Sequence, residues 1–175
     1  IYMGIGMGTE FGMVAAIFHI LTHAATKSLL FISCSGLTDV SDFHRQFVPL
    51  TGAGYRHKIA GIAFTVGSLS MVGVPLFAGF ISKLLFAQSA VALHGRMLPV
   101  LIVLGISTIL NAIYFMKTVI RIYTPVENSP YKTIKMMDVK VYSLVLILFV
   151  VVNVALGVNS DPVVELIRQG LAMFA

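Results

Sequence analysis

Residues 73–83, GVPLFAGFISK, lie within an apolar stretch that covers residues 59–93. A membrane-crossing helix needs about 20 apolar residues, so this stretch is too long to be one simple span. Proline removes a backbone donor and its ring clashes with the preceding turn, which predicts a break at Gly73 and Pro75. We therefore expect two short spans, 59–74 and 76–93. Gly79 follows Pro75 so closely that it predicts a further helix break in the second span.

Lys83 lies near the middle of the span 76–93. A charged side chain is costly to bury in a membrane, so its presence there favours a functional role. A discontinuous helix beside it would offer helix ends and free backbone groups to a hydrated cavity. The alternative is a proline-kinked pair of helices with a lysine that reaches to the interface, and the central position of Lys83 argues against it.

Three further apolar segments, 11–36, 97–122 and 141–157, are suited to cross a membrane. Connectors that carry prolines and charges separate the spans. These patterns predict an all-α integral membrane protein with about five transmembrane helices, one of them interrupted at the Gly-Pro break. We expect a single membrane domain over residues 1–175.

The last segment of the sequence has a different pattern. Asp161 followed by Pro162 is typical of a helix start, with the carboxylate as the N-cap and proline in the first helical position. Apolar residues then recur on one face, with charged residues between them. This pattern predicts an amphipathic helix at the membrane surface over residues 161–175.

The composition excludes several classes of protein. Apolar residues make up 58% of the chain and charged residues only 11%, whereas a soluble domain carries about 25% charged residues. Cys34 is the single cysteine, so the chain can form no internal disulfide and cannot ligate an iron–sulfur cluster alone. The net charge of +5 resides in connectors and not on one helical face, which argues against nucleic acid as a partner. We predict no cofactor.

The basic residues give no orientation if five spans are counted. One side would carry Arg45, Arg56, Lys58, Arg96 and Arg168, and the other Lys117, Arg121, Lys132, Lys135 and Lys140. Equal numbers on the two sides leave the positive-inside rule without a signal.

His19, His23 and Lys27 follow one another at intervals of four residues within the span 11–36. This spacing places them on one stripe of a helix, spread over about 12 Å along its axis. Histidine titrates near neutral pH, and desolvation lowers the pKa of a lysine toward the same range. The row therefore has the form of a proton relay.

Two other interpretations of this row stay open. The histidines could satisfy backbone carbonyls while Lys27 extends toward the interface, although Lys27 lies far below the end of the span. Histidines at i and i+4 could also bind zinc, but the sequence offers no third ligand nearby and a lysine one turn away would repel a cation. We predict no metal site.

Two sequence motifs together resemble a known family. HILTHAATKSLLF, residues 19–31, and the later GVPLFAGFISKLLF, residues 73–86, are similar to the antiporter-like membrane subunits of respiratory complex I, of Mrp sodium/proton antiporters and of membrane-bound hydrogenases. The resemblance implies that this chain is the C-terminal part of a larger bundle. On this comparison His19, His23 and Lys27 belong to a central relay and Lys83 is the exit-side group.

The resemblance also implies an activity and partners. It implies translocation of protons, or of sodium against protons, as a non-redox subunit of a complex with other membrane subunits in the cytoplasmic membrane. The earlier half of the family, with the glutamate–lysine pair of the entry path, is absent from this sequence, and Glu10 is at the edge of a span and cannot replace it. The chain begins abruptly in apolar sequence, and we expect a longer parent protein.

Two alternative functions belong to other classes. The chain could be a non-conducting scaffold that only packs against partner subunits. It could also be an unrelated transporter whose Gly-Pro break binds a small solute, but that interpretation requires an internal inverted repeat, which we do not find in the sequence.

Overall fold

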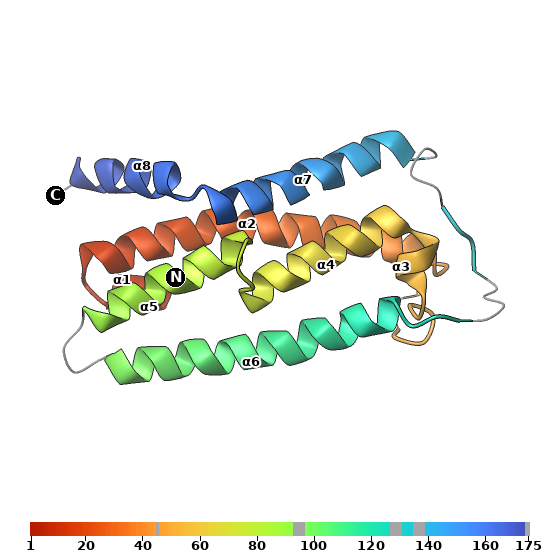
Figure 1. Cartoon of the computed structure of the whole chain (residues 1–175), viewed down its shortest axis with the longest axis horizontal. Coiled ribbons are helices and arrows are strands. Elements are labelled where there is room, and N and C mark those ends of the chain that lie inside the picture. Colours follow the sequence, from red (N-terminus) through yellow and green to blue (C-terminus); the bar gives the residue numbers. More distant parts are fainter. Residues whose placement is uncertain (45, 93–96, 127–130, 135–138, 174–175) are drawn as a thin grey trace.

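The computed structural model describes residues 1–44, 46–92, 97–126, 131–134 and 139–173, and every regular element in these ranges is a helix (Figure 1). Two earlier expectations extend past these ranges, since position 93 of the span 76–93 and positions 174–175 of the tail lie outside them. The helices are α1 (Tyr2–Gly6), α2 (Glu10–Asp39), α3 (Ala53–Arg56), α4 (Lys58–Val72), α5 (Ala78–Val91), α6 (Met97–Ile122), α7 (Lys140–Val158) and α8 (Asp161–Ala172).

The helix boundaries agree closely with the hydropathy pattern. The five predicted spans correspond to α2, α4, α5, α6 and α7, and α6 has the predicted limits. Three of these helices, α2, α6 and α7, are long and apolar enough to cross a membrane alone. The short helices α1 and α3 were not predicted, because four or five residues are too few to show a period. The result is an all-helical membrane bundle.

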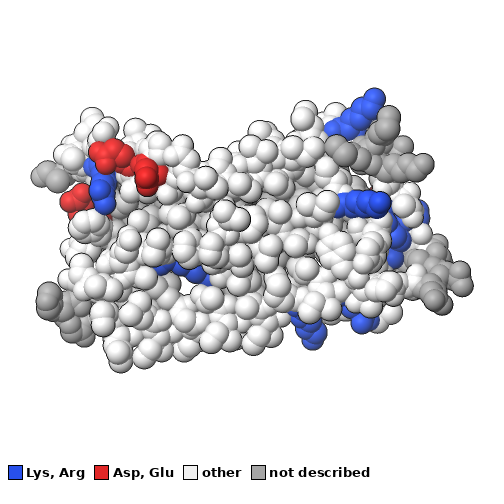
Figure 2. Space-filling model, viewed as in Figure 1, with Lys and Arg blue, Asp and Glu red and all other residues white. Residues whose placement is uncertain are grey.

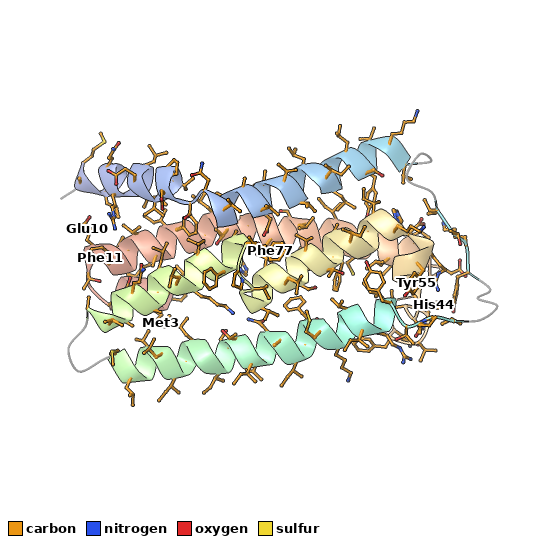
Figure 3. All side chains as sticks on the ribbon, viewed as in Figure 1. Met3, Glu10, Phe11, His44, Tyr55 and Phe77 are labelled. Atoms are coloured by element: carbon orange, nitrogen blue, oxygen red, sulfur yellow. The ribbon has the colours of Figure 1, made fainter. Side chains whose placement is uncertain are left out.

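The arrangement of α4 and α5 differs from the prediction of two separate crossings. These helices have 15 and 14 residues, and each is shorter than the roughly 20 residues that a crossing requires. They lie end to end beside α2, whose 30 residues extend along both of them (Figure 1). Together they therefore cross the bundle once, with the break between them at mid-length, where Phe77 is labelled in Figure 3.

Contacts between connectors confirm this path of the chain. The Lys132 ammonium group forms an ion pair of 2.9 Å with Asp39. Lys132 lies in the connector after α6, and Asp39 is the last residue of α2. The amide of Gly52 donates to the carbonyl of Arg121 at 3.3 Å in the same region. Both connectors hence lie at one end of the bundle, and the chain makes four passes: α2, α4 with α5, α6, and α7.

This path separates the charges of the two ends. Arg45, Arg96 and Lys135 lie outside the described residues, which leaves nine of the 12 Lys and Arg residues. Two of the nine are Lys27 and Lys83 inside the bundle, and Arg168 lies on α8 at the opposite end. The six at the connector end, which we call the basic end, are Arg56, Lys58, Lys117, Arg121, Lys132 and Lys140. Figure 2 shows the same division on the face it presents.

Arg56 holds the basic end together. Its guanidinium group is buried and donates to the carbonyls of Val40, Thr51 and Pro49 at 3.1, 2.8 and 2.9 Å. These carbonyls belong to the segment between α2 and α3, which has no regular pattern of backbone hydrogen bonds of its own. Burial also lowers the pKa of the adjacent His57, which favours its neutral form at pH 7.

The tail forms α8 as predicted, with one difference at its start. Ser160 is the N-cap, and Asp161 and Pro162 are the first helical residues. A carboxylate in the first turn still interacts favourably with the positive end of the helix dipole. The helix packs beside the first half of α2 and continues the line of α7 (Figure 1). Its position at a membrane surface stays a prediction.

Four passes predict the sidedness of the chain. Since basic residues are retained on the cytoplasmic side, we expect the basic end to face the cytoplasm. In the full-length protein with Cys34→Ser, cysteines introduced as Phe43→Cys and Lys132→Cys should react with an impermeant maleimide from the cytoplasmic side. Gln169→Cys should react only from the other side. Five crossings would instead place positions 43 and 169 together and position 132 opposite.

Candidate functional site

The break between α4 and α5 is built so that few backbone groups are left without a partner. The amides of Gly73 and Val74 donate back to the carbonyls of Ser70 and Leu69, both at 3.0 Å. Gly73 has φ +89°, the left-handed conformation in which glycine avoids the strain of a Cβ. Leu76 adopts φ +83° without that freedom, so the segment around Pro75 is held under strain.

Lys83 supplies the remaining partner at this helix end. Its Nζ donates to the carbonyl of Val72, the last residue of α4, at 2.6 Å. It also donates to Oγ1 of Thr108 on α6 at 2.9 Å. An ammonium group is favourable there because the carboxyl end of a helix carries partial negative charge. A Cβ on Gly73 would come within 2.8 Å of the Lys83 side chain, so glycine also leaves the room for this contact.

Gly79 has a different place from the predicted one. It is the second residue of α5 and so lies just past the break, which covers residues 73–77. Its amide donates to Oγ of Ser70 at 3.1 Å, and a Cβ in this position would collide with the Ser70 carbonyl. Gly79 therefore permits the close approach of the two half-helices and does not interrupt α5.

His19 and His23 lie on the face of α2 that meets α5. Nδ1 of His19 is 2.6 Å from Oγ of Ser82, and the two imidazole rings lie 5.4 Å apart between their centroids. Ser82 precedes Lys83 on α5, so a direct hydrogen bond links the histidine pair of α2 to the residue beside the lysine of the broken helix. The ring of Phe86 packs edge-on against His19 at 5.5 Å.

A cavity of about 330 Å³ joins these groups. His19, His23 and Lys83 line it together with polar side chains from three helices, and part of its wall is apolar. The polar lining residues besides these three are Thr22, Thr26, Ser70, Ser107 and Asn111. The structure therefore brings the two histidines and Lys83, which are 60 or more residues apart in sequence, to one space.

Lys27 does not line this cavity. It lines a second cavity of about 250 Å³ nearer the basic end, with Cys34, Phe47 and Thr118 among its neighbours. The predicted stripe of three thus divides between two spaces, because α5 contributes to the wall beside the histidines, whereas α4 and the end of α6 line the space beside Lys27. No hydrogen bond to Lys27 is present within the described part of the chain.

A small polar network lies where four helices meet. Nδ2 of Asn153 on α7 donates to Oγ1 of Thr26 on α2 at 2.7 Å, and Thr26 lies 3.3 Å from Oγ of Ser70 on α4. Ser70 in turn accepts from Gly79 on α5. Asn153 is fully buried in the chain. This network fixes the four helices against one another, as expected for polar groups inside a membrane bundle.

Sequence reasoning did not find Ser70, Ser82 and Thr108. Each is a small hydroxyl residue in an apolar helix, and such residues often bond only to a carbonyl of their own helix. Their part in the site depends on which helices are neighbours. A usable signal was the sequence Ser82-Lys83, in which a hydroxyl stands beside the intramembrane charge.

The sequence matches a described family of membrane proteins. Residues 1–110 match the family described as NADH:quinone oxidoreductase/Mrp antiporter, transmembrane. The chain belongs to this family. The matched residues include α2, α4 and α5. They therefore include the two histidines, His19 and His23, and the two lysines that line cavities, Lys27 and Lys83.

Curated relatives are similar over nearly the whole chain. A protein named as antiporter subunit mnhD2 from Staphylococcus aureus strain JH9 is 28% identical over 166 residues, which is 94% of this chain and 32% of the relative. The protein of the same name from strain Mu3 is 28% identical over 172 residues, 92% of this chain and 33% of the relative. The chain thus spans about a third of the length of these relatives.

The close approach at Gly79 makes a specific prediction about stability. In the full-length protein, Gly79→Ala should lower the free energy of unfolding by about 1–3 kcal/mol, because the added methyl group must push α5 away from Ser70. Thermal unfolding in detergent measures the change. Gly170→Ala is the matched control, since a Cβ there meets no atom within 4 Å. It should leave stability unchanged or raise it slightly. Equal effects of the two substitutions would contradict the packing role of Gly79.

Proposed function

We propose that this chain forms part of a path that moves protons, or sodium against protons, across an energy-conserving membrane. The observation that carries the proposal is the cavity of about 330 Å³ that holds His19, His23 and Lys83 on its wall. Membership of the family and the names of the relatives support it. In this proposal the chain works within a multi-subunit membrane complex in the cytoplasmic membrane.

The chemistry of the cavity suits proton transfer. Imidazole can accept a proton on one nitrogen and release one from the other, and the contact between His19 and Ser82 extends this exchange to a hydroxyl group. Ser82 stands next to Lys83 in α5. The proposed route across this space therefore leads from the histidine pair, through Ser82 and water, to Lys83, whose neutral amine accepts the proton and becomes an ammonium ion.

The charge of Lys83 also affects the backbone. As an ammonium ion it donates to the Val72 carbonyl at the negative end of the half-helix α4. After loss of its proton it would interact less strongly with that end, since hydrogen bonds from charged donors are roughly twice as strong. We propose that protonation of Lys83 is coupled in this way to the geometry of the helix break.

Lys27 has a separate place in this proposal. Its cavity lies toward the basic end, beside Cys34 and Thr118, and Thr26, the residue before it, lines the histidine cavity. Lys27 would therefore exchange protons between the two spaces. The non-conducting scaffold is the second candidate, and the variants below separate it from translocation.

We expect Lys83→Ala in the full-length protein to abolish ion translocation and to leave assembly of the complex largely intact. Removal of a charged group that is held inside a membrane does not by itself unfold a bundle packed by apolar contacts. Proton uptake into vesicles that contain the complete complex measures the effect. Lys117→Ala, at the basic end and outside both cavities, should keep most of the activity. Normal uptake by the Lys83 variant would contradict the proposal and favour the scaffold.

Lys27→Arg tests whether Lys27 transfers protons or only supplies charge. A guanidinium group keeps its proton at every accessible pH, so we expect the arginine variant to fail nearly as badly as Lys27→Ala. A structural cation would tolerate arginine, because charge and reach are preserved. The same vesicle assay is used, and the amount of assembled complex is measured for each variant. Near-normal uptake by Lys27→Arg would leave Lys27 as a structural charge.

A further inference from the structure

A third cavity lies away from the proposed path, on the side of the bundle where α4 and α7 pack together. It has a volume of about 560 Å³, within the range of about 300–1,000 Å³ that is usual for small-molecule sites. Side chains of α4, of α7 and of the connector before α7 line it. We call it the α4–α7 groove.

The groove is polar at one end and apolar along the rest. Lys58, Tyr55 and Thr133 lie at the basic end, and the walls below them include Ile62, Ile147 and Val150. Ile62 and Ile147 are 57% and 40% exposed, so large apolar side chains stand open in the groove. A polar head above an apolar channel between two membrane helices matches the shape of a phospholipid.

Lys58 gives the groove its charge preference. Asp39, a carboxylate at the same end, is paired with Lys132 at 2.9 Å. The described residues provide Lys58 with no hydrogen bond or ion pair, and its side chain is exposed. A free ammonium group at the membrane interface attracts a phosphate, and clusters of basic residues at this position are typical of sites for anionic lipids.

We propose that the α4–α7 groove binds a phospholipid with an anionic headgroup. One acyl chain lies along Ile62, Ile147 and Val150, and the headgroup phosphate pairs with Lys58. The phenol of Tyr55 lies at the level of the headgroup, where tyrosine is enriched in membrane proteins. The predicted orientation places the groove in the cytoplasmic leaflet, where the surface is negatively charged.

The connector before α7 holds the groove closed at its polar end. The amide of Ile134 donates to the Arg56 carbonyl at 2.9 Å, which ties this connector to α3. Ile134 also lines the groove. The headgroup site therefore rests on a connector that is already tied to α3, so it is formed before a lipid binds.

Native mass spectrometry of the full-length protein tests the proposal, with phosphatidylglycerol and phosphatidylcholine offered in equal amounts. We expect the wild type to retain phosphatidylglycerol preferentially. Lys58→Gln should lower retention of phosphatidylglycerol about fivefold, the factor expected for one lysine near a charged headgroup. It should lower retention of phosphatidylcholine less, because the choline cation offsets the charge of the phosphate. Lys117→Gln, a lysine of the basic end outside the groove, should change neither.

A second pair of variants tests the apolar part of the groove. Ile147→Trp should displace the acyl chain and reduce retention of both lipids, whereas Leu148→Trp, at an exposed neighbour that does not line the groove, should not. Equal retention of the two lipids by the wild type, or no loss with Lys58→Gln, would overturn the proposal. A cross-link from Ile62→Cys to another protein segment in the assembled complex would also overturn it, because polypeptide would then fill the groove.

Discussion

The hydrogen bond from Lys83 to the Val72 carbonyl is the interaction that organises the proposed site at the helix break. A helix that stops inside a membrane leaves carbonyl groups without water molecules that could donate hydrogen bonds to them. Each such unsatisfied carbonyl lowers the stability of the fold. The turn at Gly73 satisfies two of them, and the Lys83 ammonium group satisfies the last carbonyl of α4. The same contact holds the lysine in the membrane interior. The break and the charge thus stabilise each other locally, while apolar packing holds the rest of the bundle.

Much of this fold could be predicted from the sequence. The apolar segments gave the limits of the long helices to within a few residues, since a membrane helix must satisfy its own backbone and so follows hydropathy closely. Gly73 and Pro75 located the break for local steric reasons. The row of histidines and Lys27 followed from helical spacing, and the resemblance to the antiporter-like family is confirmed by the family match.

The rest depends on which helices are neighbours, and a single sequence does not record this. Two helices of 15 and 14 residues placed end to end nearly match the 30 residues of α2, and this arrangement places both connectors at the basic end. The contacts of Ser82 with His19 and of Thr108 with Lys83 join different helices. The separation of Lys27 from the histidine cavity follows from side chains that α4, α5 and α6 contribute. The helical period of α2 shows that His19, His23 and Lys27 share one stripe. It does not show that this stripe faces two separate cavities.

The central place of α2 has a consequence for biosynthesis. Apart from α1, every helix that packs against α2 follows it in the sequence, and these include both half-helices, α7 and α8. As the chain is made, α2 is therefore inserted before these partners, and each of them meets a helix surface that already exists. The half-helices α4 and α5, each too short to span the bilayer, enter beside a partner that offers Thr26 and His19 to their serine hydroxyls.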